Sequence, residues 1–429
     1  MKSAILLCCL FLQVTSTCGS LVDQFNATSH QLMRYITSGP GKGVAYEWLA
    51  ELADGFGSRQ VGSESLEKAI DFVVEKLKKD GFDNVHTEEV PNLPHWRRGD
   101  DVVMMLEPRA HKLNILAIDG TPPGDITAEA VVITDFDELK NVNISGKIVV
   151  IVEQWTGYGE TAKIPSCCQQ QVASWRAEML KRIYQRKKRI LIRMNIKSRE
   201  VGKVSSRNTI FDVTGTTHPN EIVLLSGHMD SWDVGQGALD DGGGMAVAWH
   251  ALKTDFRTLR VVFWTAEEQG LFGAQAYFNA SKGRSEKMFF VSESDQGAFR
   301  PTNWDSVLNA QGNKTHVSVR EARELSALLS ELVTWLLDLK KLDETVKLIN
   351  QFGIPLSIKE SSSQGDVASW AAEGVPSVNY VSDKGTNYYF YFHHTQADYM
   401  NIFQEGDLEY TTAIFATLAH VIGNMDNWE

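Results

Sequence analysis

The second half of the chain alternates short apolar runs with stretches of helical periodicity. Apolar runs of about five residues are typical of strands buried on both faces of a sheet. Strands that alternate with helices along a chain build a parallel or mixed sheet with helices on both faces. The sequence therefore predicts an α/β fold with a mixed, mostly parallel central sheet flanked by helices. The apolar runs are residues 222–226, 259–264, 288–292 and 378–382, and the helical patterns are residues 244–252, 325–348 and 408–422.

The first half of the chain has two textures. Residues 44–80 carry apolar side chains at helical spacing, and Ser63 or Ser65 is placed to cap a helix there. Residues 101–152 instead contain short apolar runs, among them residues 113–118, separated by turn residues. We expect helices in the first region and several strands in the second.

A polar cluster follows each of the first three predicted strands of the second half. His228 and Asp230 follow the first strand, Glu267 and Glu268 follow the second, and Asp295 follows the third. Ligands of open α/β sheets bind in the crevice beyond the carboxyl ends of the strands. We therefore expect these side chains to meet at one edge of the sheet.

A fourth polar cluster, residues 393–398, follows an aromatic run at residues 388–392. The aromatic run fits a buried strand best, and the wall of a substrate pocket is the alternative. Each cluster alone is a weak signal, because a lone His-X-Asp, Glu-Glu or Asp-Asp-Gly is common at a surface. All four clusters directly follow apolar runs in one half of the chain, which favours a shared site.

Carboxylates that converge in a crevice repel one another unless cations neutralise them. Imidazole and carboxylate groups together suit zinc. Two histidines and three carboxylates exceed one tetrahedral site but match two sites that share a carboxylate, so we expect two zinc ions per chain. Two divalent cations carry one positive charge more than Asp240, Glu268 and Asp295 neutralise. The remaining charge favours a bound hydroxide, which is the nucleophile that a hydrolase needs.

The residues around these ligands suggest supporting roles. Neighbouring side chains on a strand-to-helix turn point in different directions, so of Glu267 and Glu268 one can bind metal while the other accepts a proton as general base. Asp230, two residues after His228, can accept the second imidazole N–H and so fix the ring. The glycines at residues 242–244 leave room for close backbone approach and open a helix whose N-terminus faces the site.

Several motifs together resemble the co-catalytic zinc exopeptidases of the aminopeptidase and glutamate carboxypeptidase superfamily. The resemblance runs from about residue 49 to the end of the chain, and the combination of motifs is highly specific. The motifs are GSRQVGSESLEKAI, LPHWRRGDD, HMDSWDVGQGALDDGGG, FWTAEEQGLFGAQ, ESDQGAF and YFHHTQAD.

The resemblance implies a role for each candidate residue. His393 is the less favoured of two adjacent histidines, because the family's ligand directly precedes a Ser or Thr. The implied reaction is hydrolysis of dipeptides or short peptides by a secreted or lysosomal homodimer. His228 and Asp295 are implied to bind one zinc ion, and Glu268 and His394 the other. Asp240 is implied to bridge the two ions, and Glu267 to act as the general base.

The resemblance also implies a domain layout. Residues 20–110 are expected to form the N-terminal helical part of the catalytic domain, and residues 206–429 the di-zinc catalytic core. Residues 111–205 resemble an inserted, β-rich, protease-associated-type domain that is truncated, because Lys163 and Ile164 join two segments that lie apart in relatives. The loop at residues 361–366 is expected to face the substrate.

The N-terminus predicts entry into the secretory pathway. Residues 1–19 have a basic residue, a short apolar run and small residues, as a signal peptide does. Apolar runs in the chain are shorter than the roughly 20 residues that span a bilayer, so we expect no membrane span. Low cysteine usage, with Cys167 and Cys168 left after the leader, argues against a disulfide scaffold. Four N-glycosylation sequons agree with secretion: Asn26, Asn143, Asn279 and Asn313.

Charge excludes one class of partner. The formal net charge is −12, whereas a nucleic-acid-binding face needs clustered Lys and Arg. The basic run at residues 181–193 fits the solvated end of a helix. A peptide substrate is therefore the expected partner, and nucleic acid is not.

Two alternatives to this carboxypeptidase-like or dipeptidase-like exopeptidase remain open. One is an aminopeptidase of the same superfamily, because the loops that read a peptide terminus are not recognisable in the sequence. The other is a non-catalytic receptor or binding protein on the same fold. The full set of five ligands and a base favours an enzyme over the binding protein.

Overall fold

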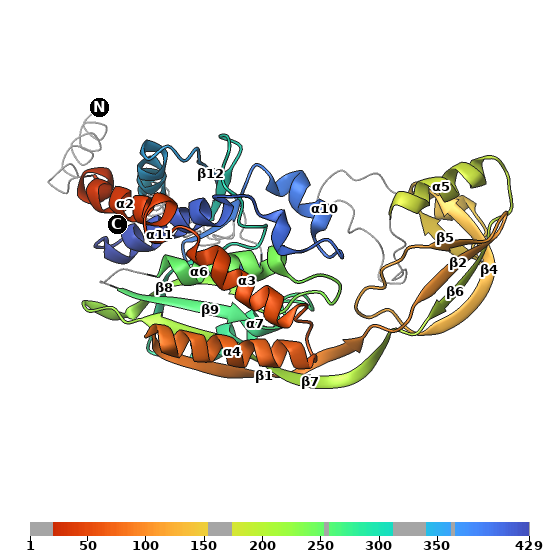
Figure 1. The fold of residues 1–429 in the computed structure, drawn as a ribbon, viewed down its shortest axis with the longest axis horizontal. Coiled ribbons are helices and arrows are strands. Elements are labelled where there is room, and N and C mark those ends of the chain that lie inside the picture. Colours follow the sequence, from red (N-terminus) through yellow and green to blue (C-terminus); the bar gives the residue numbers. More distant parts are fainter. Residues whose placement is uncertain (1–19, 153–173, 253–256, 312–339, 362–364, 429) are drawn as a thin grey trace, which may run out of the picture.

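The computed structural model describes residues 20–152, 174–252, 257–311, 340–361 and 365–428. The predicted signal peptide, the Lys163–Ile164 junction, Cys167, Cys168 and the sequon at Asn313 lie outside these residues. Figure 1 shows a large body built on one sheet and a smaller sheet at one end, joined by the long strands β1 and β7. No helix in the described ranges has the length and apolar character that a membrane span requires.

The large sheet has eight strands in the order β1-β7-β9-β8-β10-β13-β11-β12. Its four central strands, β9, β8, β10 and β13, are parallel, whereas β1, β7 and β11 pair antiparallel with a neighbour. The predicted mixed sheet is thus confirmed. Its strands are β1 (Asp83–Arg97), β7 (Arg199–Val213), β8 (His218–His228), β9 (Arg257–Trp264), β10 (Lys287–Glu293), β11 (Val307–Gln311), β12 (Ser357–Glu360) and β13 (Ser377–Val381).

Helices cover both faces of this sheet. Alternate residues of β8 enter different cores, as the two-residue period of a strand requires: Val223 and Leu225 pack with α3, α4, α6 and α11, and Ile222 and Leu224 pack with α7 and α9. Ser63 caps α4 by accepting a hydrogen bond from the amide of Leu66, as predicted. The helices are α2 (Leu21–Ser38), α3 (Val44–Phe56), α4 (Glu64–Asp80), α6 (Gly243–Ala251), α7 (Phe272–Ser281), α9 (Ala368–Ala372), α11 (Asp407–Asn424), and residues 340–351.

The smaller sheet has five strands in the order β3-β2-β6-β4-β5 and its own apolar core, which includes Val103 and Ile192. It begins at Val102, ahead of the boundary expected at residue 111. β3 ends at Leu113, so the strand expected over residues 113–118 is not formed. The elements of this part are β2 (Val102–Glu107), β3 (His111–Leu113), β4 (Gly124–Ile133), η1 (Phe136–Asn141), β5 (Ile148–Ile151), α5 (Ser174–Gln185) and β6 (Leu191–Ile196).

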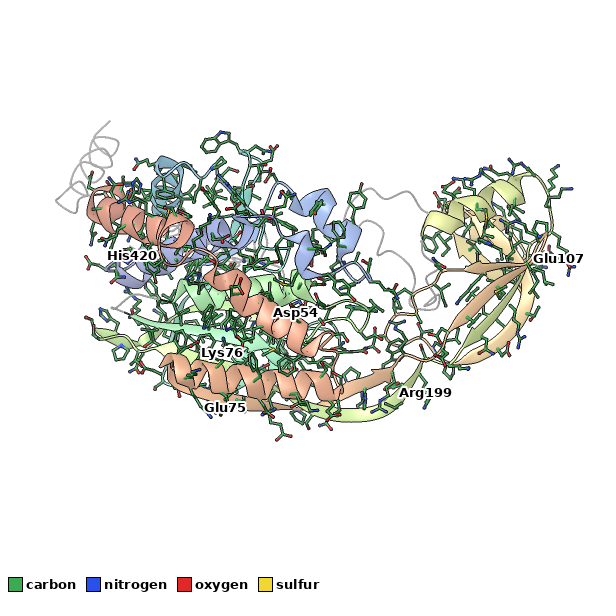
Figure 2. All side chains as sticks on the ribbon, viewed as in Figure 1. Asp54, Glu75, Lys76, Glu107, Arg199 and His420 are labelled. Atoms are coloured by element: carbon green, nitrogen blue, oxygen red, sulfur yellow. The ribbon has the colours of Figure 1, made fainter. Side chains whose placement is uncertain are left out.

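The aromatic run at residues 388–392 is helical, and the prediction of a buried strand was wrong. It spans η3 (Gly385–Tyr389) and α10 (Phe390–Phe392). The rings of Tyr388 and Phe392 lie 4.9 Å apart, a contact between positions i and i+4 that a helical turn permits and an extended strand does not. Both rings line a cleft of about 690 Å³ between the end of α3, where Figure 2 labels Asp54, and η4 (Met400–Ile402).

Three predicted glycosylation positions can be located on the surface. Asn26 in α2, Asn143 after η1 and Asn279 in α7 are all exposed. Their exposure is what a glycan requires, and their modification stays a prediction.

Arg260 in β9 pairs with Asp212 at 2.7 and 2.8 Å, and both side chains are buried. Arg260→Met leaves a buried carboxylate without its cation, so we expect the free energy of unfolding to fall by about 3–5 kcal/mol. Arg193→Met is the matched control, because it breaks a similar pair with Asp125 that is half exposed. Urea denaturation measures both variants, and equal effects would contradict the burial argument.

Candidate metal centre

The carboxyl ends of the parallel strands bring the predicted residues together. His228 is the last residue of β8, Glu267 and Glu268 follow the end of β9, and Asp295 follows the end of β10. Because these strands are adjacent and parallel, their ends share one edge of the sheet. Asp240 reaches the same edge from η2 (Ala238–Gly242), which leads into α6.

Asp240 lies between two groups of side chains. Its Oδ1 is 3.2 Å from Nε2 of His228, which is in turn 3.5 Å from Oδ1 of Asp295. Its Oδ2 is 3.1 Å from Nε2 of His394, which is 2.9 Å from Oε2 of Glu268. We call the first group, with Asp240 Oδ1, the His228 side and the second, with Asp240 Oδ2, the His394 side. One carboxylate thus faces an imidazole and a second carboxylate on each side.

His393 also belongs to this neighbourhood. Its Nε2 is 3.4 Å from Oδ2 of Asp240, and its ring stacks on His394 with centroids 3.4 Å apart. Both histidines therefore approach the shared carboxylate, but the 2.9 Å contact with Glu268 belongs to His394. Three triplets of candidate ligands in the described part of the chain have ligand atoms within 4.8 Å of one another: Asp240–His393–His394, His228–Asp241–Asp295 and His228–Asp240–Glu268.

The two adjacent glutamates face different surroundings. The side chain of Glu268 is 4% exposed and lies against His394, whereas that of Glu267 is 18% exposed and lies 4.0 Å from His228. The turn that separates them from β9 includes Ala266 at a φ of 58°. One glutamate is therefore enclosed in the centre, and its neighbour is open to solvent at the edge of the centre.

Asp230 acts differently from the sequence-based expectation. The Nδ1 of His228 lies 2.8 Å from the backbone carbonyl of Asp230, while the carboxylate is 3.9 Å away. The carboxylate instead accepts hydrogen bonds from the amides of Glu267 and Glu268, at 3.1 and 3.3 Å. Asp230 thus fixes the imidazole through its main chain and the glutamate turn through its side chain.

Three further residues that sequence reasoning missed hold the centre in place. Asp241 accepts hydrogen bonds from the amides of His228 and Gly244. Asp398 accepts from the amide of Leu239 at 2.6 Å and, at 3.3 Å, from that of Asp240. Arg59, fully buried, donates to the carbonyls of Met229, Gln236 and Gly237 and so ties both ends of the 229–237 loop.

Sequence signals for these residues were available in part. Arg59 and Asp398 fall inside motifs that carry the family resemblance, but nothing in their spacing indicates contact with the 227–244 region.

The structure explains why a glycine stands at position 244. A Cβ at Gly244 would lie 1.9 Å from the carbonyl oxygen of Ser294. The helix predicted to open at the glycines does so, since α6 starts at Gly243.

The electrostatics of the centre are those of crowded, buried acids. Burial, with the neighbouring Asp240, raises the pKa of Glu268 to about 7, and burial raises the pKa of Glu267 well above its usual value. Burial opposes a charge on His394, but Glu268 and Asp240 outweigh it and raise its pKa to about 10. Protons on imidazoles and carboxyls thus relieve the repulsion, a role that divalent cations can take over.

The donor set fits zinc. Imidazole nitrogens and carboxylate oxygens are ordinary zinc ligands. Each side has three of them, one oxygen of Asp240 included, and His393 is a fourth on the His394 side. In addition, Oε1 of Glu268 is buried and accepts no hydrogen bond from the residues that the structure describes. A buried oxygen of this kind is costly unless it binds a donor or a cation.

The fold and the centre together define a class of protein. Residues 208–419 match the model of peptidase family M28, and the chain belongs to this family. Carboxypeptidase Q of Mus musculus is 36% identical and aligns with 89% of this chain and 86% of its own length. Carboxypeptidase Q of Bos taurus is 32% identical, with 94% and 90% covered. These findings confirm the resemblance inferred from the motifs.

Solved structures show the same fold. A peptidase M28 precursor from Shewanella amazonensis has a TM-score of 0.76 and 25% identity, and covers 94% of this chain and 98% of that protein. A zinc aminopeptidase from Bacillus subtilis has a TM-score of 0.61 and 16% identity, with 88% and 94% covered, which shows the fold alone. The relationship to carboxypeptidase Q supports a metallopeptidase.

Asp240 is the residue whose loss should affect both sides of the centre. We expect Asp240→Asn to retain less than one divalent ion per chain after purification with zinc, because a neutral amide is a poor ligand in place of a shared carboxylate. Elemental analysis measures the content, and Asp125→Asn in the smaller sheet is the control. Full metal content in Asp240→Asn would contradict the bridging position.

Proposed function

We propose that the protein is a zinc-dependent exopeptidase that hydrolyses dipeptides or short peptides with two zinc ions per chain. The observation that carries the proposal is the placement of Asp240, whose two oxygens face separate imidazole and carboxylate groups. His228 and Asp295 would hold one ion and Glu268 and His394 the other, with Asp240 shared. A di-metal arrangement of this kind suits hydrolysis of an amide bond.

The residues of the chain supply positioning and proton transfer. Bound zinc ions would polarise the substrate carbonyl and lower the pKa of a water molecule. Glu267 lies beside the centre without being enclosed in it, and its raised pKa suits a group that takes a proton from water and passes it to the leaving amine. Asp230 accepts the amide of Glu267 and so holds the main chain from which the carboxylate of Glu267 projects.

The peptide terminus that is read remains a choice between two related activities. Relatives named carboxypeptidase Q, which cover most of this chain, favour a carboxypeptidase or dipeptidase. An aminopeptidase is the second candidate, since a solved structure with this fold bears that name. A binding protein without activity is disfavoured, because the five candidate ligands meet at one edge of the sheet and Glu267 lies beside them.

The setting of the protein is part of the proposal. The leader predicted at residues 1–19 and exposed sequons such as Asn26 and Asn279 support a secreted or lysosomal glycoprotein. The homodimer implied by the family resemblance is proposed with it.

The two adjacent glutamates give the sharpest test of the mechanism. Glu267→Gln keeps the shape of the base and removes its proton acceptor, so zinc should stay bound while kcat falls by at least about 100-fold. Glu268→Gln removes a charge from the His394 side, so one zinc ion should bind more weakly and added zinc should restore part of the activity. An exchange of these two behaviours would exchange the roles, and normal turnover in Glu267→Gln would refute hydrolysis at this site.

Blocked substrates decide which terminus is read. We expect free dipeptides to be cleaved, C-amidated dipeptides to be cleaved poorly, and N-acetylated dipeptides to be tolerated if the enzyme is a carboxypeptidase. Quantified release of amino acids measures this, with the Glu267→Gln variant as the blank. Loss of cleavage on N-acetylation and its retention on C-amidation would identify an aminopeptidase instead.

A further inference from the structure

Trp232 contacts two residues of the His394 side. Its indole Nε1 donates a hydrogen bond to Oε2 of Glu268 at 2.7 Å, and its ring lies 4.7 Å from the ring of His394, centroid to centroid. It therefore constrains both the carboxylate and the imidazole that would hold the second metal ion. Trp232 itself sits on the 229–237 loop, between β8 and η2.

The next residue of that loop is held from outside the large sheet. Arg98 pairs with Asp233 through two parallel hydrogen bonds, from Nε to Oδ2 at 2.6 Å and from Nη2 to Oδ1 at 2.7 Å. A third donor of Arg98, Nη1, reaches the carbonyl of Ala117 at 2.8 Å, and its guanidinium lies 5.0 Å from the ring of Trp96. The paired side chains are 22% and 16% exposed, so solvent screens the pair only in part.

Arg98 occupies the junction between the two sheets. It follows β1 of the large sheet and precedes β2 of the smaller sheet, and the returning chain enters β7 at Arg199, labelled in Figure 2. The outgoing and returning chains are tied together, because the carboxylate of Asp101 accepts the amides of Lys197 and Ser198 at 2.7 and 2.9 Å. Gly99 packs so closely that a Cβ would lie 2.5 Å from the main chain of Lys197.

The loop is therefore attached from two sides. Within the large body, the side chain of Arg59 holds the carbonyls of Met229, Gln236 and Gly237, and its amide donates a hydrogen bond to Oγ of Ser231. The carboxylate of Asp230 adds the contacts with the glutamate turn described above. Arg98 holds its middle, at Asp233, from the junction. Removal of Arg98 leaves the ends in place, so the expected effect is a shift of Trp232 rather than loss of the fold.

We propose that the Arg98–Asp233 pair, acting through Trp232, is a positioning device for the His394 side of the metal centre, and that it couples this side to the junction with the smaller sheet. Arg98, Asp233 and Trp232 are positioning residues, because they act on Glu268 and His394 rather than on substrate. The inference rests on the proposed metal centre for its effect on zinc, but the contact of Trp232 with Glu268 is independent of metal.

Zinc affinity is the first measurement. Competition with a chromophoric chelator should resolve two zinc ions in the wild type. In Arg98→Gln, Asp233→Asn and Trp232→Phe one ion should bind about 10-fold more weakly, the size expected when a residue that supports a metal ligand is removed. The zinc ion whose affinity falls should be the same one whose affinity falls in Glu268→Gln, and the affinity for the other ion should be unchanged.

Two variants separate positioning from general destabilisation. Arg193→Gln removes a comparable bidentate pair, with Asp125, inside the smaller sheet and should leave both affinities unchanged. The exchanged pair Arg98→Asp with Asp233→Arg should restore part of the lost affinity, since the charges are reversed but present. Unchanged affinity for both ions in Arg98→Gln, or an equal loss for both, would overturn the proposal.

A crystal structure of metal-free Arg98→Gln provides the measurement that needs no zinc. We expect the hydrogen bond between Trp232 and Glu268 to be lost while the Arg59 contacts with the loop ends persist. Retention of that hydrogen bond would overturn the positioning role. If the wild type binds no zinc, the proposed function fails, and this structure still decides whether Arg98 positions Trp232.

Discussion

The burial of many carboxylates at one edge of a sheet is the constraint on which this structure depends. Two kinds of partner make the burial tolerable. Some carboxylates accept hydrogen bonds from main-chain N–H groups and so stabilise the local backbone, namely those of Asp230, Asp241 and Asp398. The carboxylates of Asp240, Glu268 and Asp295 instead face imidazoles across the centre. Because the carboxylates of the first kind already accept main-chain hydrogen bonds, the oxygens of Asp240, Glu268 and Asp295 define where a cation can bind.

Arg59 completes this arrangement and forms no close ion pair with the residues that the structure describes. Its guanidinium donates to backbone carbonyls of the 229–237 loop, and burial lowers its pKa while the surrounding aspartates oppose that shift. A fully buried cation that binds main-chain oxygens stabilises a loop geometry and also offsets negative charge nearby. The loop that carries Trp232 is therefore ordered by the same residue that moderates the field of the centre.

The sequence predicted those site residues that directly follow a predicted strand. His228, Glu268 and Asp295 each follow an apolar run, and parallel strands bring their carboxyl ends together. His394 as a ligand and Asp240 as a bridge came from the family resemblance, and the structure brings both side chains into contact in the centre. The alternation of strands and helices likewise predicted the mixed sheet, because burial on both faces leaves a continuous apolar run.

Contacts between distant segments were beyond the sequence. The carboxylate of Asp230 accepts hydrogen bonds from the amides of Glu267 and Glu268 and not from the nearby imidazole. Spacing along the chain cannot predict which of these donors the carboxylate binds. The run at residues 388–392 folds as helical turns, in which Tyr389 is buried and Tyr391 is 70% exposed. A strand would place these two side chains on the same face, so tertiary packing decides between the two conformations. The separation of the candidate ligands along the chain has one further consequence. His228 and His394 lie far apart in the sequence but both contact Asp240, so the candidate centre cannot form on a nascent chain before residue 394 has been synthesised. Any activity that depends on this centre therefore starts only after translation has passed that residue.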